Sequence, residues 1–584
     1  MSLRLNNILT PRYYISSVAL ALVCIGLSAC QPQSLSCEDC LSIHNDQFWN
    51  TAEQTPLYSQ GGGIFRYTDP QEGKERYFWY GMHYKEAETY RNSPTQKYRG
   101  CTFESVTIYV SDDLVNWHTV RDAITRHDLL NLGLPLGWLG RMGVVYIEAA
   151  RKYVLMMQHN NSVLVATSDS PRGPFEYYRS LDMTSYCGTP NTGDQTVFVD
   201  PDTGRGYLVY CKANGRNKIF LSEIGLTAND SIGLLDVHEV FHGAGREGNC
   251  MFKYQGEYYL CASDLWGWDC SHAYFLRAKD IYGPYEPLND MQQILHCERD
   301  FSHLTQTGFF YTHRSEDGKE TVIYCGDRWA NFANNGLGYN QWIPLSFDHI
   351  GAPIFNSVSS WHFNHATGEW HVARDNNYIL NGSFDADRRS IPEPKKPRQA
   401  YLTGWDTEFI TGRIVAHEDT LSPRLNRGNS SIDQVHVTGK MALNISDWQT
   451  FHRRVSQRVE ETSTLPLPPG VYILQARIKG EGDSLRCTMF ASSDKDLPMI
   501  YPLVSREYNN GIPTVVDENS IASKKDKDIS YDLGIFTLTP NSEWQSIQIP
   551  IEITQPSLRI GFDVSGSTDA YCHIDDVTLV RQPQ

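Results

Sequence analysis

The stretch Tyr77-Phe-Trp-Tyr-Gly81 has the aromatic composition of a buried β-strand. Four later stretches have the same aromatic and β-branched character: Lys152-Tyr-Val-Leu-Met156, Gly206-Tyr-Leu-Val-Tyr210, Glu257-Tyr-Tyr-Leu-Cys261 and Thr321-Val-Ile-Tyr-Cys325. Most of them follow a turn, such as Thr203-Gly204 or Gln255-Gly256. Short strands that recur with no long amphipathic helix between them predict an all-β fold.

Each of these strand cores belongs to a larger repeat. Several are followed by a second strand and a similar ending: Val110-Ser-Asp-Asp-Leu-Val-Asn-Trp117, Ala166-Thr-Ser-Asp-Ser-Pro-Arg-Gly-Pro-Phe175 and Ala278-Lys-Asp-Ile-Tyr-Gly-Pro-Tyr285. Their spacing is irregular but near the roughly 40–50 residues of a β-propeller blade. Because one such repeat cannot bury an apolar face alone, we expect the repeats to pack radially. We therefore predict a five-bladed β-propeller over residues 45–374.

A different strand pattern begins near Asn381-Gly-Ser-Phe384 and continues to the end of the chain. Residues alternate in strands such as Tyr472-Ile-Leu-Gln-Ala-Arg-Ile, and the blade endings are absent. This pattern predicts a β-sandwich of the jelly-roll type over residues 375–584. Its opening and closing motifs resemble those of carbohydrate-binding modules, which implies that Asp575 and Asp576 could help to hold a structural calcium ion. The alternative is a packing domain that supports the propeller.

The first thirty residues have the features of an export signal. Arg4 and Arg12 form a basic region, an apolar stretch follows from Ile15 to Leu27, and Leu27-Ser-Ala-Cys30 resembles a bacterial lipobox. We predict a signal peptide over residues 1–30, lipidation of Cys30, and a tether over residues 31–44. The protein would then be anchored in the bacterial outer membrane, on its periplasmic or its cell-surface face. An ordinary secretory peptide is the alternative.

The composition restricts the class of partner. A formal net charge of −17 with no basic run argues against binding of nucleic acid or anionic lipid surfaces. The aromatic content of 12% suits neutral carbohydrate, because sugar rings stack on Trp and Tyr. No Cys or His spacing predicts a zinc site, and no cofactor is expected. Cys250, Cys261 and Cys270 are candidates for disulfides, although buried free thiols are the more usual outcome.

Three polar stretches lie just ahead of strand cores: Thr192-Gly-Asp194-Gln-Thr, Arg246-Glu247-Gly-Asn and Thr305-Gln306-Thr-Gly. Inverting hydrolysis of a glycoside requires an acid that protonates the leaving oxygen and a group that activates water on the opposite face. The acid needs a raised pKa, which burial and a neighbouring carboxylate provide. Glu247 suits the acid, and Asp194 suits the neighbouring carboxylate.

The propeller resembles glycoside hydrolase family 43, and within it the exo-β-1,3-galactanases. The resemblance rests on motifs that occur in order over residues 58–347: Gln60-Gly-Gly-Gly-Ile64, the blade endings at 111–117 and 165–175, Asp194, Glu247-Gly-Asn-Cys-Met-Phe252, Thr305-Gln306-Thr307, Gly326-Asp-Arg-Trp329 and Gln341-Trp-Ile-Pro-Leu345. It implies that Glu247 is the general acid and Asp194 its pKa modulator. The usual first-blade Asp is replaced by Gly61-Gly62-Gly63, as in the galactanases, which implies that Gln306 positions the water as an imidic acid.

The chain departs from this subgroup at two positions. Its usual Glu-Arg-Pro motif is Gly140-Arg141-Met142 here, and Gln60 replaces a histidine. Losing a hydrogen bond to a substrate hydroxyl commonly changes specificity by orders of magnitude, so the sugar that is cleaved becomes the open point. The predicted substrate contacts are Gln60, Gly62, Arg141, Trp268, Asp327 and Arg328. A packing role is the alternative for Trp268, and a structural Arg–Asp pair is the alternative for the last two.

Three functions are compatible with these observations. The first is inverting, exo-acting hydrolysis of β-1,3-linked galactose in galactan or arabinogalactan of plant cell walls or proteoglycans. The second is another family 43 activity, namely α-L-arabinofuranosidase or β-xylosidase, which the missing first-blade Asp disfavours. The third is a lipoprotein that binds glycans without cleaving them, which the presence of Glu247 disfavours.

Overall fold

The computed structural model describes residues 40–92, 101–267, 270–271, 273–288, 303–329, 338–387, 402–411, 424–425, 442–493, 507–509, 512–514 and 531–583. The chain divides into a short unit, Met1–Asp39, and a compact unit, Cys40–Gln584. The predicted signal peptide, its lipidated Cys30 and residues 31–39 of the predicted tether lie outside the described residues. Of the helices that are described, none has the length and apolar character to cross a membrane.

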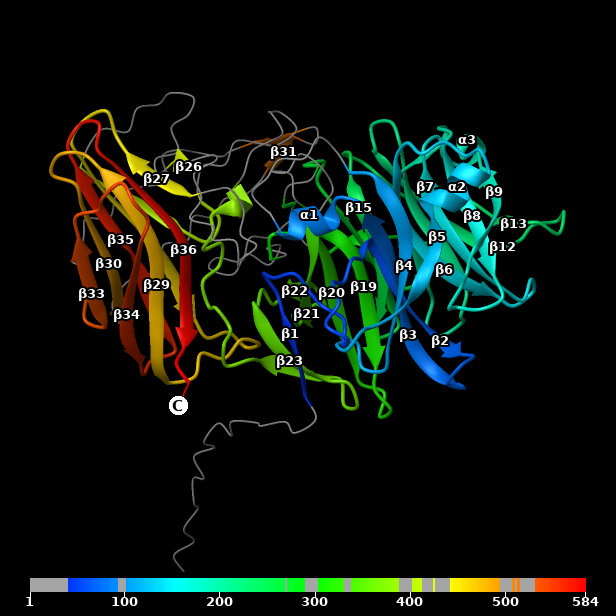
Figure 1. Ribbon diagram of the computed structural model, residues 1–584, viewed down its shortest axis with the longest axis horizontal. Helices are drawn as coiled ribbons and strands as arrows, with labels where there is room; N and C mark the ends of the chain where they lie inside the picture. The colour runs from blue at the N-terminus through cyan, green and yellow to red at the C-terminus, as the bar shows by residue number, and fades with distance from the viewer. Residues whose placement is uncertain are drawn as a thin grey trace, which may run out of the picture. The chain divides into compact units, whose positions relative to one another are not determined.

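Five antiparallel sheets follow one another along the chain and confirm the predicted propeller (Figure 1). The first is β2 (Gln60–Asp69), β3 (Lys74–Tyr84), β4 (Phe103–Ser111) and β5 (His118–Thr125); the second is β6 (Leu139–Ile147), β7 (Lys152–His159), β8 (Ser162–Ser168) and β9 (Glu176–Leu181). The third is β10 (Thr192–Val199), β11 (Gly206–Lys212), β12 (Lys218–Leu226), β13 (Ile232–Leu234) and β14 (His238–His242); the fourth is β15 (Glu247–Tyr254), β16 (Glu257–Ser263), β17 (Ala273–Ala278) and β18 (Glu286–Pro287). The fifth is β19 (Gln306–Arg314), β20 (Glu320–Trp329), β21 (Gly338–Phe347) and β22 (Pro353–Phe355).

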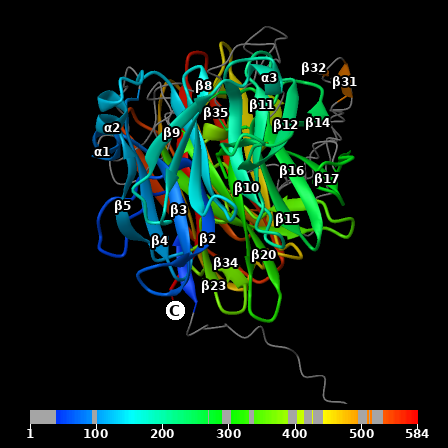
Figure 2. The same cartoon turned by 90° about the vertical axis from the view of Figure 1, so that its right-hand side faces the viewer.

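The first strands of the five sheets form a closed ring. Contacts join β2 to β6, β6 to β10, β10 to β15, β15 to β19, and β19 back to β2. Figure 2 shows β2, β10 and β15 near the middle of the blades. The ring also closes through a hydrogen bond of 3.1 Å from the Gly61 amide in the first blade to Asp327 Oδ1 in the fifth. The five predicted strand cores all lie in the second strand of a blade, which is buried on both faces.

Short elements surround the blades. They are α1 (Ala87–Asn92), α2 (Arg126–Asn131), α3 (Thr184–Cys187) and η2 (Asp385–Asp387). Thr125 caps α2: its hydroxyl accepts a hydrogen bond from the Asp128 amide, and the Asp128 carboxylate accepts one from the Thr125 amide. A separate sheet joins β1 (Leu41–His44) to β23 (Ser360–Asn364) and β24 (Glu369–Val372). The prediction that residues 41–44 belong to the tether is therefore corrected, because burial of Ile43 holds them in this sheet.

The second strand pattern forms two five-stranded sheets, as expected for a β-sandwich. One sheet is β25 (Asp406–Thr411), β28 (Phe451–Glu460), β35 (Ser557–Gly566), β30 (Arg486–Ser493) and β33 (Gly534–Leu538). The other is β26 (Arg424–Leu425), β27 (Leu443–Ser446), β36 (Tyr571–Arg581), β29 (Gly470–Glu481) and β34 (Gln545–Ile553). A small hairpin, β31 (Glu507–Asn509) and β32 (Ile512–Thr514), is separate. Alternate residues of β29 are buried, and they form one core with both sheets.

Candidate active site

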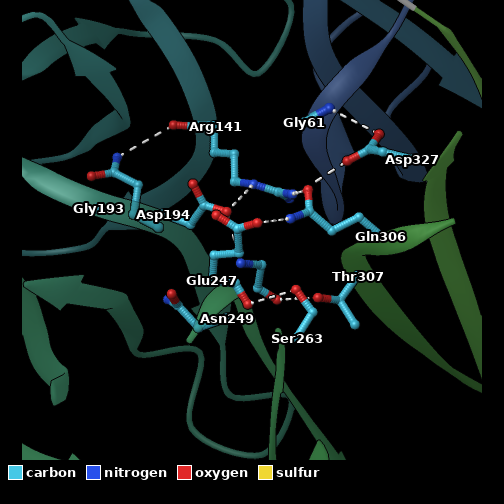
Figure 3. A network of polar contacts seen from close by, with 12 residues as sticks. Gly61, Arg141, Gly193, Asp194, Glu247, Asn249, Ser263, Gln306, Thr307 and Asp327 are labelled. Carbon is cyan, nitrogen blue, oxygen red and sulfur yellow. Dashed lines mark hydrogen bonds and ion pairs between the residues drawn. The ribbon is translucent and has the colours of Figure 1, made fainter. Parts of the chain in front are cut away.

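A β-bulge opens the innermost strand of every blade. The pairing register shifts between Gln60 and Gly63, Leu139 and Met142, Thr192 and Gln195, Glu247 and Cys250, and Gln306 and Phe309. A bulge bends its strand and re-aims the side chains at that point. Because the five strands form one ring, four polar residues at these bulges converge on a common site, as Figure 3 shows: Arg141, Asp194, Glu247 and Gln306.

Glu247 lies at the centre of this cluster and is 7% exposed. Its Oε1 atom accepts hydrogen bonds from the Gly267 amide and from Gln306 Nε2, both at 2.9 Å. Its Oε2 atom accepts one from Arg216 Nη1. Burial, followed by the negative charge of Asp194, raises the pKa of Glu247 to about 7, although Arg216 opposes the shift. A carboxyl group with this pKa is half protonated near neutrality, as a general acid requires.

Asp194 lies beside Glu247 but titrates in the opposite direction. Burial raises the pKa of Asp194, yet the combined charges of Arg141 and Arg216 and a hydrogen bond of 2.7 Å from the Gly248 amide hold it below its ordinary value. Arg141 Nε lies 3.3 Å from Asp194 Oδ2. Two carboxyl groups whose pKa values are pushed apart can divide the roles of proton donor and charged neighbour. This arrangement suits the predicted roles of Glu247 and Asp194.

Gln306 joins the acid to the fifth blade and is 3% exposed. Its Oε1 atom accepts hydrogen bonds from Arg141 Nη2 at 3.1 Å and from Trp329 Nε1 at 2.9 Å (Figure 3 shows the first). These two donors fix the amide orientation, so Nε2 points at Glu247. Gln306 is therefore held in direct contact with the acid.

The buried side chains of Arg141 and Asp327 contact each other beside the catalytic cluster. Asp327 is 1% exposed; its Oδ1 accepts from the Gly61 amide, and its Oδ2 lies 3.5 Å from Arg141 Nη1. Burial raises the pKa of Asp327, and Arg141 opposes this. A carboxylate so fully enclosed cannot reach a water beside the substrate. The geometry therefore favours a role in positioning Arg141 and Gly61 over the predicted substrate contact.

The other predicted contacts fall in different environments. Gln60 is buried, and its Nε2 atom has no hydrogen-bond partner among the described residues. A Cβ atom at Gly62 would lie 1.7 Å from the Tyr80 carbonyl oxygen, so Gly62 is required by strand packing. Arg328 Nη2 lies 3.6 Å from Asp385 Oδ2, away from the catalytic cluster. Trp268 lies outside the described residues.

Arg216 was not predicted from the sequence. It follows the turn between β11 and β12, adopts a left-handed backbone (φ 48°), and reaches both carboxylates. The only sequence signal is the turn Asn214-Gly215 before it, which gives no indication that the arginine would point toward the ring.

The space at Gly140, where the galactanase subgroup that the sequence resembles usually has a glutamate, is crowded. A Cβ atom at Gly140 would lie 2.7 Å from Gln158 Oε1 and 2.9 Å from the Trp138 ring. Gln158 is buried, and its Oε1 atom has no hydrogen-bond partner among the described residues. The exposed Trp138 was also missed from the sequence. A side chain at position 140 would thus meet an amide and an indole ring at its first carbon.

Neither a metal cluster nor a disulfide is part of this site in the described residues. No group of three or more His, Cys, Asp or Glu side chains in that part of the chain could hold a metal ion. The calcium ion expected near Asp575 and Asp576 stays a prediction. Of the disulfide candidates, Cys250 and Cys261 are free thiols that face each other across β15 and β16.

Comparison with known proteins identifies the enzyme class. Residues 80–339 are similar to glycosyl hydrolases family 43, and this match supports the class of glycoside hydrolase. The comparison with curated proteins gave no match. Matching solved structures include an exo-β-1,3-galactanase from Phanerochaete chrysosporium with β-1,3-galactotriose (TM-score 0.47, 19% identity, covering 92% of this chain and 99% of that chain). Another is an exo-β-1,3-galactanase from Clostridium thermocellum (TM-score 0.46, 20% identity, covering 70% and 81%).

Proposed function

We propose that this protein is an inverting, exo-acting glycosidase that hydrolyses β-1,3-linked galactose in galactan or arabinogalactan. The observation that supports this most strongly is the buried Glu247 beside the ionised Asp194, with Gln306 in direct contact. Glu247 would give its proton to the glycosidic oxygen as the C–O bond breaks. Water held by Gln306 would attack from the opposite face, and the imidic-acid form of Gln306 would accept the water's proton at nitrogen.

Substrate must change the geometry of this pair. Gln306 Nε2 lies 2.9 Å from Glu247 Oε1. The acid and the water-activating group of an inverting glycosidase stand about 6.5–9.5 Å apart, with the sugar and water between them. A sugar that enters the ring must therefore separate Gln306 from Glu247.

The first experiment is sugar release from β-1,3-galactan and arabinogalactan by residues 31–584. Galactose release that both E247Q and Q306A abolish is the expected result. E257Q is the matched control, since it makes the same change on the same blade at the start of β16. Release that persists in E247Q contradicts the proposal. Glycan binding without any release would support a binding protein instead.

A second candidate, another family 43 activity, is favoured by the environment of Gly140. Gln158 and Trp138 fill the space of the carboxylate that would hold galactose, so a different sugar could be selected. Arabinofuranosides and β-xylosides belong in the same assay. Faster release from either than from β-1,3-galactan would favour this candidate.

We further propose that Cys30 anchors the protein in the bacterial outer membrane and that the sandwich acts as a carbohydrate-binding module. The lipobox-like Leu27-Ser-Ala-Cys30 and the strand pattern of residues 375–584 support these proposals. C30A should move the protein from the membrane fraction to the soluble fraction. Retention of C30A in the membrane fraction would contradict the anchor.

A further inference from the structure

Within the described residues, the Glu247 carboxylate accepts three hydrogen bonds. Oε1 receives two, from the Gly267 amide and from Gln306. Oε2 receives one, from Arg216. Donors directed at a carboxylate favour its charged form. These donors therefore oppose the effect of burial on Glu247, although a general acid must carry a proton when it acts.

The proton of the acid has one suitable position. Two N–H groups occupy Oε1, so a proton there would displace one of them. Oε2 is the atom with a single donor, Arg216. A protonated Oε2 keeps one lone pair but no negative charge, so the Arg216 guanidinium disfavours a proton there. Because Arg216 contacts Oε2 directly, proton transfer from Oε2 to a leaving oxygen is favoured once Arg216 has left it.

Arg216 is placed to move. Its side chain is 31% exposed, whereas those of Glu247 and Arg141 are 9% and 5% exposed. A second acceptor is near, because Asp194 Oδ1 lies 3.6 Å from the same Nη1 atom. The backbone of Arg216 stays anchored, since its carbonyl accepts a hydrogen bond of 2.8 Å from the Arg246 amide. The side chain can thus shift without movement of the turn.

We propose that Arg216 is a movable counterion that favours the ionised form of Glu247 until the leaving-group sugar takes its place at Oε2 and displaces it toward Asp194. This inference rests on the proposed role of Glu247 as the general acid. Arg216 is a positioning residue, because it acts through the protonation of Glu247. The protonated form of Glu247 would therefore be favoured when a substrate fills the leaving-group side of the site.

Several charged groups face Glu247 and bear on its titration: Asp194 on β10, Arg141 on β6, Arg216 after the β11–β12 turn, and, through Arg141, Asp327 on β20. Arg246 pairs with Asp264 at 2.9 Å and is thereby neutralised. Of the two arginines that act on Glu247, Arg141 is fixed by Asp194 and Asp327. The exposed Arg216 is the one that a substrate can displace.

The test is the pH dependence of β-1,3-galactobiose hydrolysis by wild type, R216Q and R216K. The alkaline limb of kcat/KM reports the acid in the free enzyme, and that of kcat reports it in the complex. In wild type the kcat limb should lie about one pH unit or more above the kcat/KM limb, since an opposite charge at contact lowers a carboxyl pKa by about that much. R216Q should raise the kcat/KM limb to meet the kcat limb and leave the latter unchanged, and R216K should restore the separation. The control is R205Q, which replaces an exposed arginine on the same blade.

The proposal is overturned if the alkaline limbs of kcat and kcat/KM coincide in wild type, or if R216Q moves both limbs. In either case Arg216 would stay on Glu247 in the complex. A readout independent of turnover is the infrared titration of the Glu247 carboxyl, isolated by subtracting E247Q. Its midpoint should be higher in R216Q than in wild type, and β-1,3-galactobiose should raise it in wild type only. Equal midpoints in the two proteins would also overturn the proposal. If the protein does not hydrolyse β-1,3-galactobiose but its Glu247 carboxyl titrates as predicted, the proposed function alone is contradicted.

Discussion

Replacing Arg141 by methionine should destabilise the propeller strongly, because it leaves a buried carboxylate without its cation. Arg141 lies 3.3 Å from Asp194 and 3.5 Å from Asp327. Each attraction is on the order of 4 kcal/mol at an effective dielectric constant of about 20, and desolvation offsets part of it. Asp194 keeps Arg216, but the fully buried Asp327 keeps only the Gly61 amide among the described residues. Loss of one partner of such a pair typically costs about 3–5 kcal/mol.

The assay is urea unfolding followed by tryptophan fluorescence at neutral pH. R141M should lower the free energy of unfolding by about 3–5 kcal/mol. The double variant R141M/D327N should recover most of this loss, since asparagine can still accept the Gly61 hydrogen bond without a charge. R205M, which removes an exposed partner of Glu223, should change stability by less than about 1 kcal/mol. A double variant no more stable than R141M would refute the reasoning.

Three further predictions concern the same ring of residues. The free energy of unfolding of E247Q minus that of wild type should rise by about 3 kcal/mol between about pH 4 and about pH 8, measured by urea unfolding. The pKa of Glu247 is raised from 4.5 to about 7 by folding, so Glu247 stabilises wild type below pH 4.5 and this stabilisation is lost as pH rises through about 7. A difference that does not change with pH would contradict the raised pKa. G62A should prevent folding, because a Cβ at Gly62 meets the β3 backbone at 1.7 Å. G61A should cost only about 1–2 kcal/mol for its left-handed backbone, since a Cβ at Gly61 meets nothing closer than 3.5 Å. Equal melting temperatures by circular dichroism for the two variants would contradict this. G140E should lose activity by collision with Gln158 and the Trp138 ring, and restoration should need Q158A and W138A together, as measured by galactose release.

The strands of the propeller were predictable because they carry their own pattern. The aromatic cores at 77–81 and 257–261 are second strands, buried on both faces, and their composition is therefore apolar throughout. Glu247 and Gln306 could be selected because each opens the strand just before such a core. Position in a repeat indicated that they lie near one axis, and the resemblance to family 43 indicated their roles.

Contacts between blades were not predictable in the same way. Arg216 sits in a turn between two strands of the third blade, and only the packing of that blade against the fourth brings it to Glu247. Gln158 carries no signal because it lies within a strand core, where its neighbours Met157 and Met156 are buried hydrophobic residues. The burial of Asp327 beneath Gly61 depends on ring closure between the first and fifth blades. Sequence position alone could not separate a residue that touches substrate from one that supports it.

The central claim, that Glu247 protonates the leaving group while water attacks from the opposite face, is tested most directly by the anomeric form of the first product. Proton NMR during hydrolysis of β-1,3-galactobiose by residues 31–584 distinguishes the two anomers before they equilibrate. The account predicts that α-galactose appears first with wild type and that no galactose appears with E247Q. Initial release of β-galactose, or unchanged release by E247Q, would contradict it.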